Sequence, residues 1–173
     1  MSQLSRLFPC TLVAAAMLLS SPALAADPCR GVKTKKDAFG QTRGEMRFNM
    51  YKLGAVGLVD TGGETVLQTR WGVYSVVNAS IPAGAVVDIA LEDGTTASLT
   101  APAPSAARAM EWNGALVTTW YVNTPVDDET LAALSRSDLA AARMEVQGEL
   151  QTMNVFPAGR KQVANAAACF ASD

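Results

Sequence analysis

The sequence of 173 residues contains no histidine. Without imidazole side chains the chain cannot form Ser-His or Cys-His nucleophile pairs, nor metal sites with histidine ligands. The nucleophile motifs Gly-X-Ser-X-Gly and Ser-X-X-Lys are missing too, and no glycine cluster is followed by Gly-Lys-Ser/Thr, as in a phosphate loop. We therefore assign no catalytic residue, no metal ligand and no cofactor-binding residue, and we expect no cofactor.

Histidine is not required for every kind of catalysis. Two carboxylates can hydrolyse a glycosidic bond without being close in the sequence. Glu92, Asp93 and Glu111 are the candidates for such a pair. Polarity at the tip of a hairpin explains Glu92 and Asp93 equally well, so a carboxylate-dependent hydrolase is the least favoured function for this chain.

The chain also lacks a concentration of positive charge. Arg6 is the only charged residue among the first 25, so residues 26–173 carry 13 basic and 16 acidic side chains, a net charge of −3. Nucleic-acid binding needs a basic stripe that neutralises phosphates, and the basic residues here are scattered. We expect a protein or a small molecule as partner, and no nucleic acid.

A short apolar run lies near the N-terminus, over residues 11–19. Arg6 precedes it, and Ala23-Leu24-Ala25 supplies the small residues that a signal peptidase reads. The run is too short to span a bilayer comfortably, and Ser20, Ser21 and Pro22 interrupt it. We predict a signal peptide over residues 1–25, a single exported domain over residues 26–173 without a transmembrane segment, and a periplasmic or extracellular location.

Removal of the leader leaves two cysteines, Cys29 and Cys169. An even pair in an oxidising compartment is typical of a disulfide, and the spacing lacks the Cys-X-X-Cys motif of redox proteins. We therefore predict a structural Cys29–Cys169 disulfide that ties the two ends of the domain together.

The centre of the chain has the pattern of a β-hairpin. Apolar and polar residues alternate over residues 86–91 and 96–100, and Asp93-Gly94 lies between the two runs. A period of two buries one face of a strand, and glycine accepts the positive φ of a tight turn. The same alternation predicts strands within residues 45–53, 65–77 and 142–147. Short strands are also predicted within residues 54–63 and 150–156, and β-prone residues predict one at 115–122.

Two helices are predicted in the second half of the chain. Thr124 can cap a helix over about residues 125–135 with Pro125 at its first position, and the acids at 127–129 then lie where the helix dipole favours negative charge. A helix start explains these acids without a metal. Pro157 and the apolar spacing of Val163, Ala167 and Phe170 predict a C-terminal helix.

These elements predict a mainly β (α+β) fold, either an antiparallel β-sandwich or an open barrel, with two helices. The leading functional hypothesis is an exported, non-catalytic binding or interaction module of unknown ligand. Residues 101–108, with two prolines and many small side chains, predict an exposed, mobile loop that is a candidate binding surface. The alternative is a carrier of a small hydrophobic ligand in a sandwich or barrel pocket.

Three short motifs resemble small exported bacterial β-domain proteins of uncharacterised function. They are Lys36-Asp37-Ala38-Phe39-Gly40-Gln41-Thr42, the turn Leu91-Glu92-Asp93-Gly94, and the late Cys169-Phe170. The first motif departs from the expected Phe-Thr-Gly form, because Gly40 follows Phe39 directly. The resemblance implies a β domain with a terminal helix and no particular activity, cofactor or site.

Overall fold

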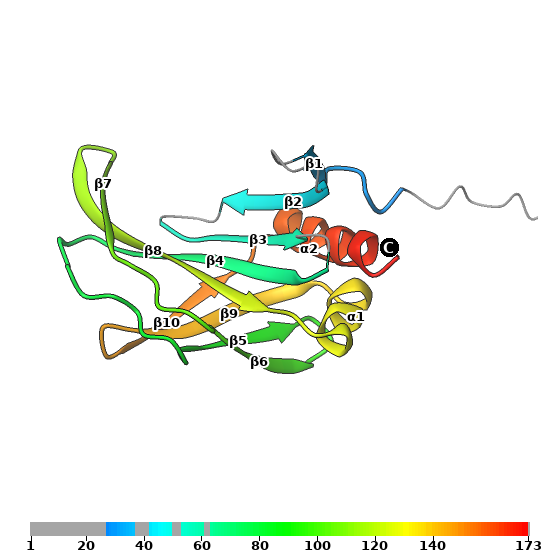
Figure 1. The fold of residues 1–173 in the computed structure, drawn as a ribbon. Helices are drawn as coiled ribbons and strands as arrows, with labels where there is room; N and C mark the ends of the chain where they lie inside the picture. The colour runs from blue at the N-terminus through cyan, green and yellow to red at the C-terminus, as the bar shows by residue number, and fades with distance from the viewer. Residues whose placement is uncertain (1–26, 37–41, 50–52, 61–62, 173) are drawn as a thin grey trace, which may run out of the picture.

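The computed structural model describes residues 27–36, 42–49, 53–60 and 63–172; the predicted leader lies outside these residues. Within these residues, ten strands form two antiparallel sheets (Figure 1). The first sheet has the order β1 (Lys33–Lys36), β2 (Thr42–Asn49), β3 (Ala55–Asp60), β4 (Thr65–Val73), β8 (Ala115–Pro125), β7 (Arg108–Trp112). The second has the order β10 (Glu149–Asn154), β9 (Leu139–Val146), β5 (Val86–Leu91), β6 (Thr96–Thr100).

The two helices, α1 (Asp128–Arg136) and α2 (Pro157–Phe170), lie together at one end of the molecule, and the β7–β8 hairpin extends from the other end (Figure 1). The prediction of a mainly β fold with a C-terminal helix is therefore confirmed. The sheets stay separate over the described residues, as in a sandwich, and do not close into a continuous barrel.

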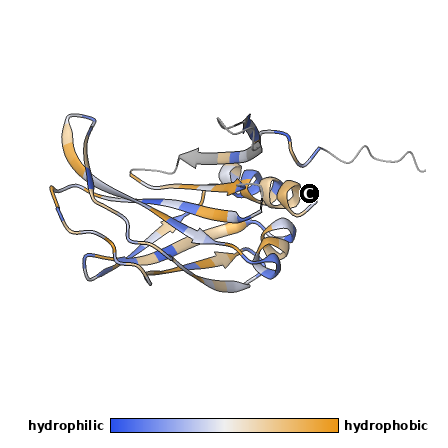
Figure 2. Cartoon of the chain, viewed as in Figure 1, coloured by the Kyte–Doolittle hydropathy of each residue, from blue (hydrophilic) through white to orange (hydrophobic). Residues whose placement is uncertain are grey.

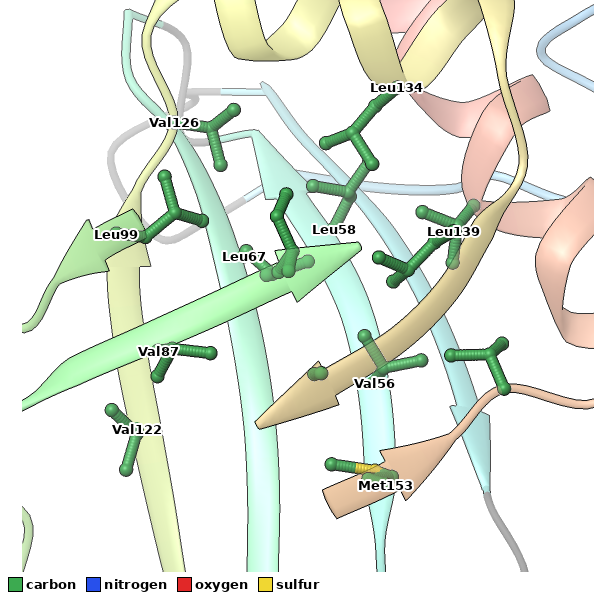
Figure 3. Packing of buried hydrophobic residues seen from close by; sticks show 14 of the residues in the cluster. Val56, Leu58, Leu67, Val87, Leu99, Val122, Val126, Leu134, Leu139 and Met153 are labelled. Carbon is green, nitrogen blue, oxygen red and sulfur yellow. The ribbon is translucent and has the colours of Figure 1, made fainter. Parts of the chain in front are cut away.

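One hydrophobic core fills the space between the sheets. Hydrophobic and hydrophilic residues alternate along several strands, so that each sheet turns one apolar face inward (Figure 2). Leu58 and Leu67 from the first sheet, Val87 from the second and Leu134 from α1 point into the same space (Figure 3). All four side chains are fully buried.

The first helix begins later than the sequence predicts. Thr124 and Pro125 belong to the end of β8, pairing with Leu67 and Val66 of β4, and the Thr124 hydroxyl donates to the Leu67 carbonyl at 3.2 Å. The prediction that Thr124 caps the helix is therefore wrong. A residue before proline is disfavoured in the α region, which suits an extended Thr124.

Asp127 is the residue that caps α1. Its Oδ1 accepts a hydrogen bond from the Thr130 backbone N–H at 2.7 Å, and the hydroxyl and N–H of Thr130 lower the pKa of Asp127. The two acids that follow, Asp128 and Glu129, lie in the first turn. The acidic run is thus a helix start, as predicted.

We expect Asp127→Ala to lower the melting temperature at neutral pH by a few degrees, because the Thr130 N–H loses its acceptor. The lowered pKa means that the carboxylate stabilises the fold above its unfolded pKa of about 3.9, and that this contribution is lost as the pH falls through the folded pKa. Thermal unfolding from pH 7 to pH 3 checks this. Asp127→Asn should keep most of the cap and lose the pH dependence, and a constant gap between wild type and Asp127→Ala at all pH values would contradict the assignment.

The chain ends are joined by the predicted disulfide, Cys29–Cys169. Cys169 is buried on α2, whereas Cys29 is in the exposed segment before β1. This bridge connects the edge of the first sheet to the C-terminal helix across 140 residues of sequence.

Candidate functional site

A surface groove lies beside β8, at the point where its pairing with β7 ends. Its volume is about 550 Å³, within the range of small-ligand sites. We call it the β8 groove. Its lining consists of Gln68 from β4, Tyr121 and Asn123 from β8, Arg108 from β7, and Pro104, Ser105 and Ala106 from the preceding segment.

Strand alternation aims the side chains of β4 and β8 into the groove. Leu67 and Val122 face the core, so their neighbours Gln68, Tyr121 and Asn123 face outward. Gln68 and Asn123 are directly opposite each other in the β4–β8 register. Cross-strand pairing therefore brings together two side chains that are far apart in the sequence.

The Gln68–Asn123 pair has hydrogen-bonding capacity left over. Gln68 Nε2 donates to Asn123 Oδ1 at 2.8 Å. This bond leaves Gln68 Oε1 as an acceptor and Asn123 Nδ2 as a donor. One acceptor and one donor are the groups that the N–H and C=O of an amide can bond.

The other side of the groove combines a cation with an aromatic ring. The Arg108 guanidinium lies over the Tyr121 ring, 5.7 Å from its centroid. Among the described residues, no carboxylate forms an ion pair with Arg108. Arg108 is the only charged residue in the groove lining, so the formal charge of the lining is positive.

The segment 101–108 is held in place at two points. Ser105 and Ile81 exchange backbone hydrogen bonds of 2.9 Å, and Ala101 bonds to Gly84 and Ala85 at 2.8 and 2.9 Å. The Ser105 hydroxyl also donates to the Tyr121 carbonyl at 2.8 Å. The predicted loop is thus anchored at its buried residues Ala101 and Ser105, while residues 102–104 between them are exposed.

A second hollow region covers the outer face of the other sheet. Two cavities there, of about 530 and 360 Å³, are both lined by Asp88. Arg143 bonds to Asp88 Oδ2 at 3.0 Å, and Ser98 donates to Asp88 Oδ1 at 2.7 Å. The Ser98 and Arg143 hydrogen bonds lower the pKa of Asp88. This central carboxylate is already paired, so the region has less to offer a charged ligand than the β8 groove.

The three candidate carboxylates do not come together. Glu92 pairs with Arg160, and Asp93 accepts from the Thr95 N–H at 2.9 Å, both at the β5–β6 turn near α1. Glu111 is exposed on β7, at the opposite end of the molecule (Figure 1). The bonds from Thr95 lower the pKa of Asp93, whereas a general acid working at neutral pH needs a raised one.

The described part of the chain contains no cluster of three or more histidine, cysteine, aspartate or glutamate side chains able to hold a metal ion. Nor does any helix within it have the length and apolar character needed to cross a membrane. Comparison of the chain with protein-family models, curated proteins and solved structures finds no match. The resemblance to small exported bacterial proteins therefore stays a prediction.

Sequence reasoning selected residues 101–108 as a candidate surface, and this segment supplies four lining residues of the β8 groove. The sequence did not identify Gln68, Tyr121 and Asn123 as candidate site residues. The alternation of β4 placed Gln68 on the outer face, which was a usable signal. Nothing in the sequence indicated that β8 would pair with β4 in the register that joins Gln68 to Asn123.

Proposed function

We propose that the chain is an exported, non-catalytic binding module that works in the periplasm or outside the cell, with the β8 groove as its ligand site. The observation that carries this proposal is the combination in one hollow of an exposed cation, an aromatic ring and a half-satisfied amide pair. Few precisely placed polar groups in a concave surface are typical of ligand sites. The predicted leader and the disulfide support an exported protein.

A rigid framework around the groove fits binding better than turnover. β4 and β8 are paired over eight residues, and the Ser105 bonds fix the opposite wall. Such a site is preorganised, which reduces the ordering cost of binding a ligand. Within the groove lining no nucleophile is paired with a base, since Ser105 donates to a backbone carbonyl.

The carrier hypothesis places a hydrophobic ligand between the sheets. Trp120, Leu58 and Leu67 are fully buried there and pack as parts of one core. The β8 groove, by contrast, is open to solvent and lined by polar side chains. We therefore place the ligand site at the surface and favour the binding module over the carrier.

We expect Ala106→Trp to block the groove. Ala106 is exposed and lines the hollow, so an indole at this position fills it without disturbing the core. The test is a titration of the ¹⁵N-labelled protein with N-acetylalanine, a trialanine peptide and cellobiose, each at millimolar concentration, followed by amide chemical shifts. At least one probe should shift resonances of residues 104–108 and 121–123, and Ala106→Trp should abolish these shifts.

Ala103→Trp is the matched control, because Ala103 is exposed in the same segment but does not line the groove. It should bind like the wild type. Both variants should melt within a few degrees of the wild type. The proposed function is contradicted by shifts that survive in Ala106→Trp, or by the absence of any shift in the groove with all three probes.

A further inference from the structure

We propose that the β8 groove binds the carboxyl-terminal end of an extended peptide. This inference rests on the proposed function and names the ligand class of the same site. Three features of the groove carry it: an exposed stretch of strand edge, an amide pair with free hydrogen-bonding groups, and an arginine that has no carboxylate partner among the described residues.

The strand edge comes from the unequal lengths of β7 and β8. β7 begins at Arg108, opposite Thr119, so the part of β8 beyond Thr119 has no strand partner on that side among the described residues. The Ser105 hydroxyl bonds to the Tyr121 carbonyl, and the Thr69 hydroxyl bonds to the Val122 carbonyl from the β4 side. Backbone groups alternate between the two edges of a strand, so those of Asn123 point to the same edge as the Tyr121 carbonyl.

No described residue outside the β-ladders bonds to the Asn123 backbone. The Tyr121 carbonyl on this edge is taken by Ser105, so the backbone N–H and carbonyl of Asn123 are the groups that can pair with a residue of an added chain, as in other cases where a peptide extends a sheet. Beside this edge, Gln68 Oε1 and Asn123 Nδ2 present an acceptor and a donor that match a peptide group. Both features recognise backbone, without regard to side chains.

Arg108 supplies the recognition of a chain end. Its guanidinium is exposed, stacks on Tyr121 and has no carboxylate partner in the described part of the chain. Glu111 is the acid nearest to Arg108 in the sequence and lies on the same strand. An odd number of positions separates the two residues, and successive side chains of a strand alternate, so Glu111 projects from the opposite face of the sheet. Guanidinium binds carboxylate through two parallel hydrogen bonds, the geometry that a terminal carboxylate can accept.

The test compares N-acetyl-trialanine as the free acid with the same peptide as the C-terminal amide, using amide chemical shifts of the purified protein with its disulfide intact. We expect the acid to bind about tenfold more tightly than the amide, which is the size of one charge-assisted hydrogen-bonded contact. Raising the salt concentration from about 0.1 to about 1 M should weaken binding of the acid and not of the amide, since exposed charges are screened. Arg108→Gln should remove the tenfold preference.

Arg136→Gln is the matched control, because Arg136 is an exposed arginine on α1, outside the groove. It should keep the preference for the acid. Asn123→Ala should weaken binding of both peptides, and Asn154→Ala, an exposed asparagine on β10, should weaken neither.

Each other outcome overturns a defined part of the proposal. Equal binding of acid and amide in the groove overturns carboxylate recognition and leaves the groove as a binding site. Equal binding of N-acetylalanine and the tripeptide acid overturns the peptide in favour of a free acylated amino acid. If cellobiose shifts the resonances of the groove and neither peptide does, the peptide ligand is overturned and the groove remains a binding site. If no probe shifts the groove, the proposed function fails with it.

Discussion

Replacement of both Cys29 and Cys169 by alanine is expected to lower the free energy of unfolding by about 4–5 kcal/mol. The disulfide closes a loop of 140 residues, and the chain-entropy model gives a loss of this size for so long a loop. A domain of this size has a total stability of roughly 5–15 kcal/mol, so the loss is a large fraction of the total. Urea unfolding followed by circular dichroism gives the number.

Alanine is the better replacement because Cys169 is buried, and a serine hydroxyl there would add a polar burial cost of its own. The matched control is the wild-type protein unfolded with and without a reductant. Reduced wild type and the double variant should have the same urea midpoint, well below that of the oxidised wild type. A double variant as stable as the oxidised protein would show that the bridge contributes little.

Trp120→Ala is expected to destabilise the domain by about 3–5 kcal/mol. Trp120 is completely buried on β8, and its Nε1 donates to the Ala79 carbonyl at 2.9 Å. The substitution removes the largest fully buried side chain among the described residues and leaves a cavity, which costs more than the lost transfer free energy alone. It also removes one of the hydrogen bonds between β8 and the β4–β5 connection, in which Ala79 lies, while the Thr118 hydroxyl keeps its bonds to Ser75 and Val77 in that connection.

The control is Trp112→Ala on β7. This indole is half-buried and contacts the Arg70 guanidinium at 6.0 Å, so its loss should cost about 1 kcal/mol or less. Trp120→Phe keeps most of the apolar volume and should lie between the two alanine variants. Urea midpoints of all three variants rank these effects, and a Trp120→Ala variant no weaker than Trp112→Ala would contradict the packing of Trp120 in the core.

Local signals predicted the elements that depend on local physics. Asp93-Gly94 marked the β5–β6 hairpin, and Gly94 adopts φ 88°, which glycine accepts without strain. Pro157 marked the first residue of α2. Gly72 lies within β4, and a Cβ at this position would lie 2.5 Å from the Leu53 Cβ, so the close approach of these two segments requires glycine.

The β7–β8 hairpin also has a local signal, which the strand predictions overlooked. Asn113-Gly114 is a hairpin signal as strong as Asp93-Gly94; both of its residues have positive φ, 50° and 77°, and they join β7 to β8. The predicted strand at 115–122 therefore had an unrecognised partner in residues 108–112. The short strand β1 was missed for a different reason: Lys33 to Lys36 has no apolar alternation, and only its pairing with β2 makes it a strand.

By itself the sequence determined the mainly β class, the two helices and the disulfide. Alternation and helix-start signals act over short range, and once the leader is removed only two cysteines remain to pair with each other. Only the tertiary structure decided the candidate site. Gln68 and Asn123 are 55 residues apart and meet because β8 pairs with β4 in one register, which burial of Leu67 and Val122 enforces. Register is a property of two strands packed on one core, so neither strand carries it alone.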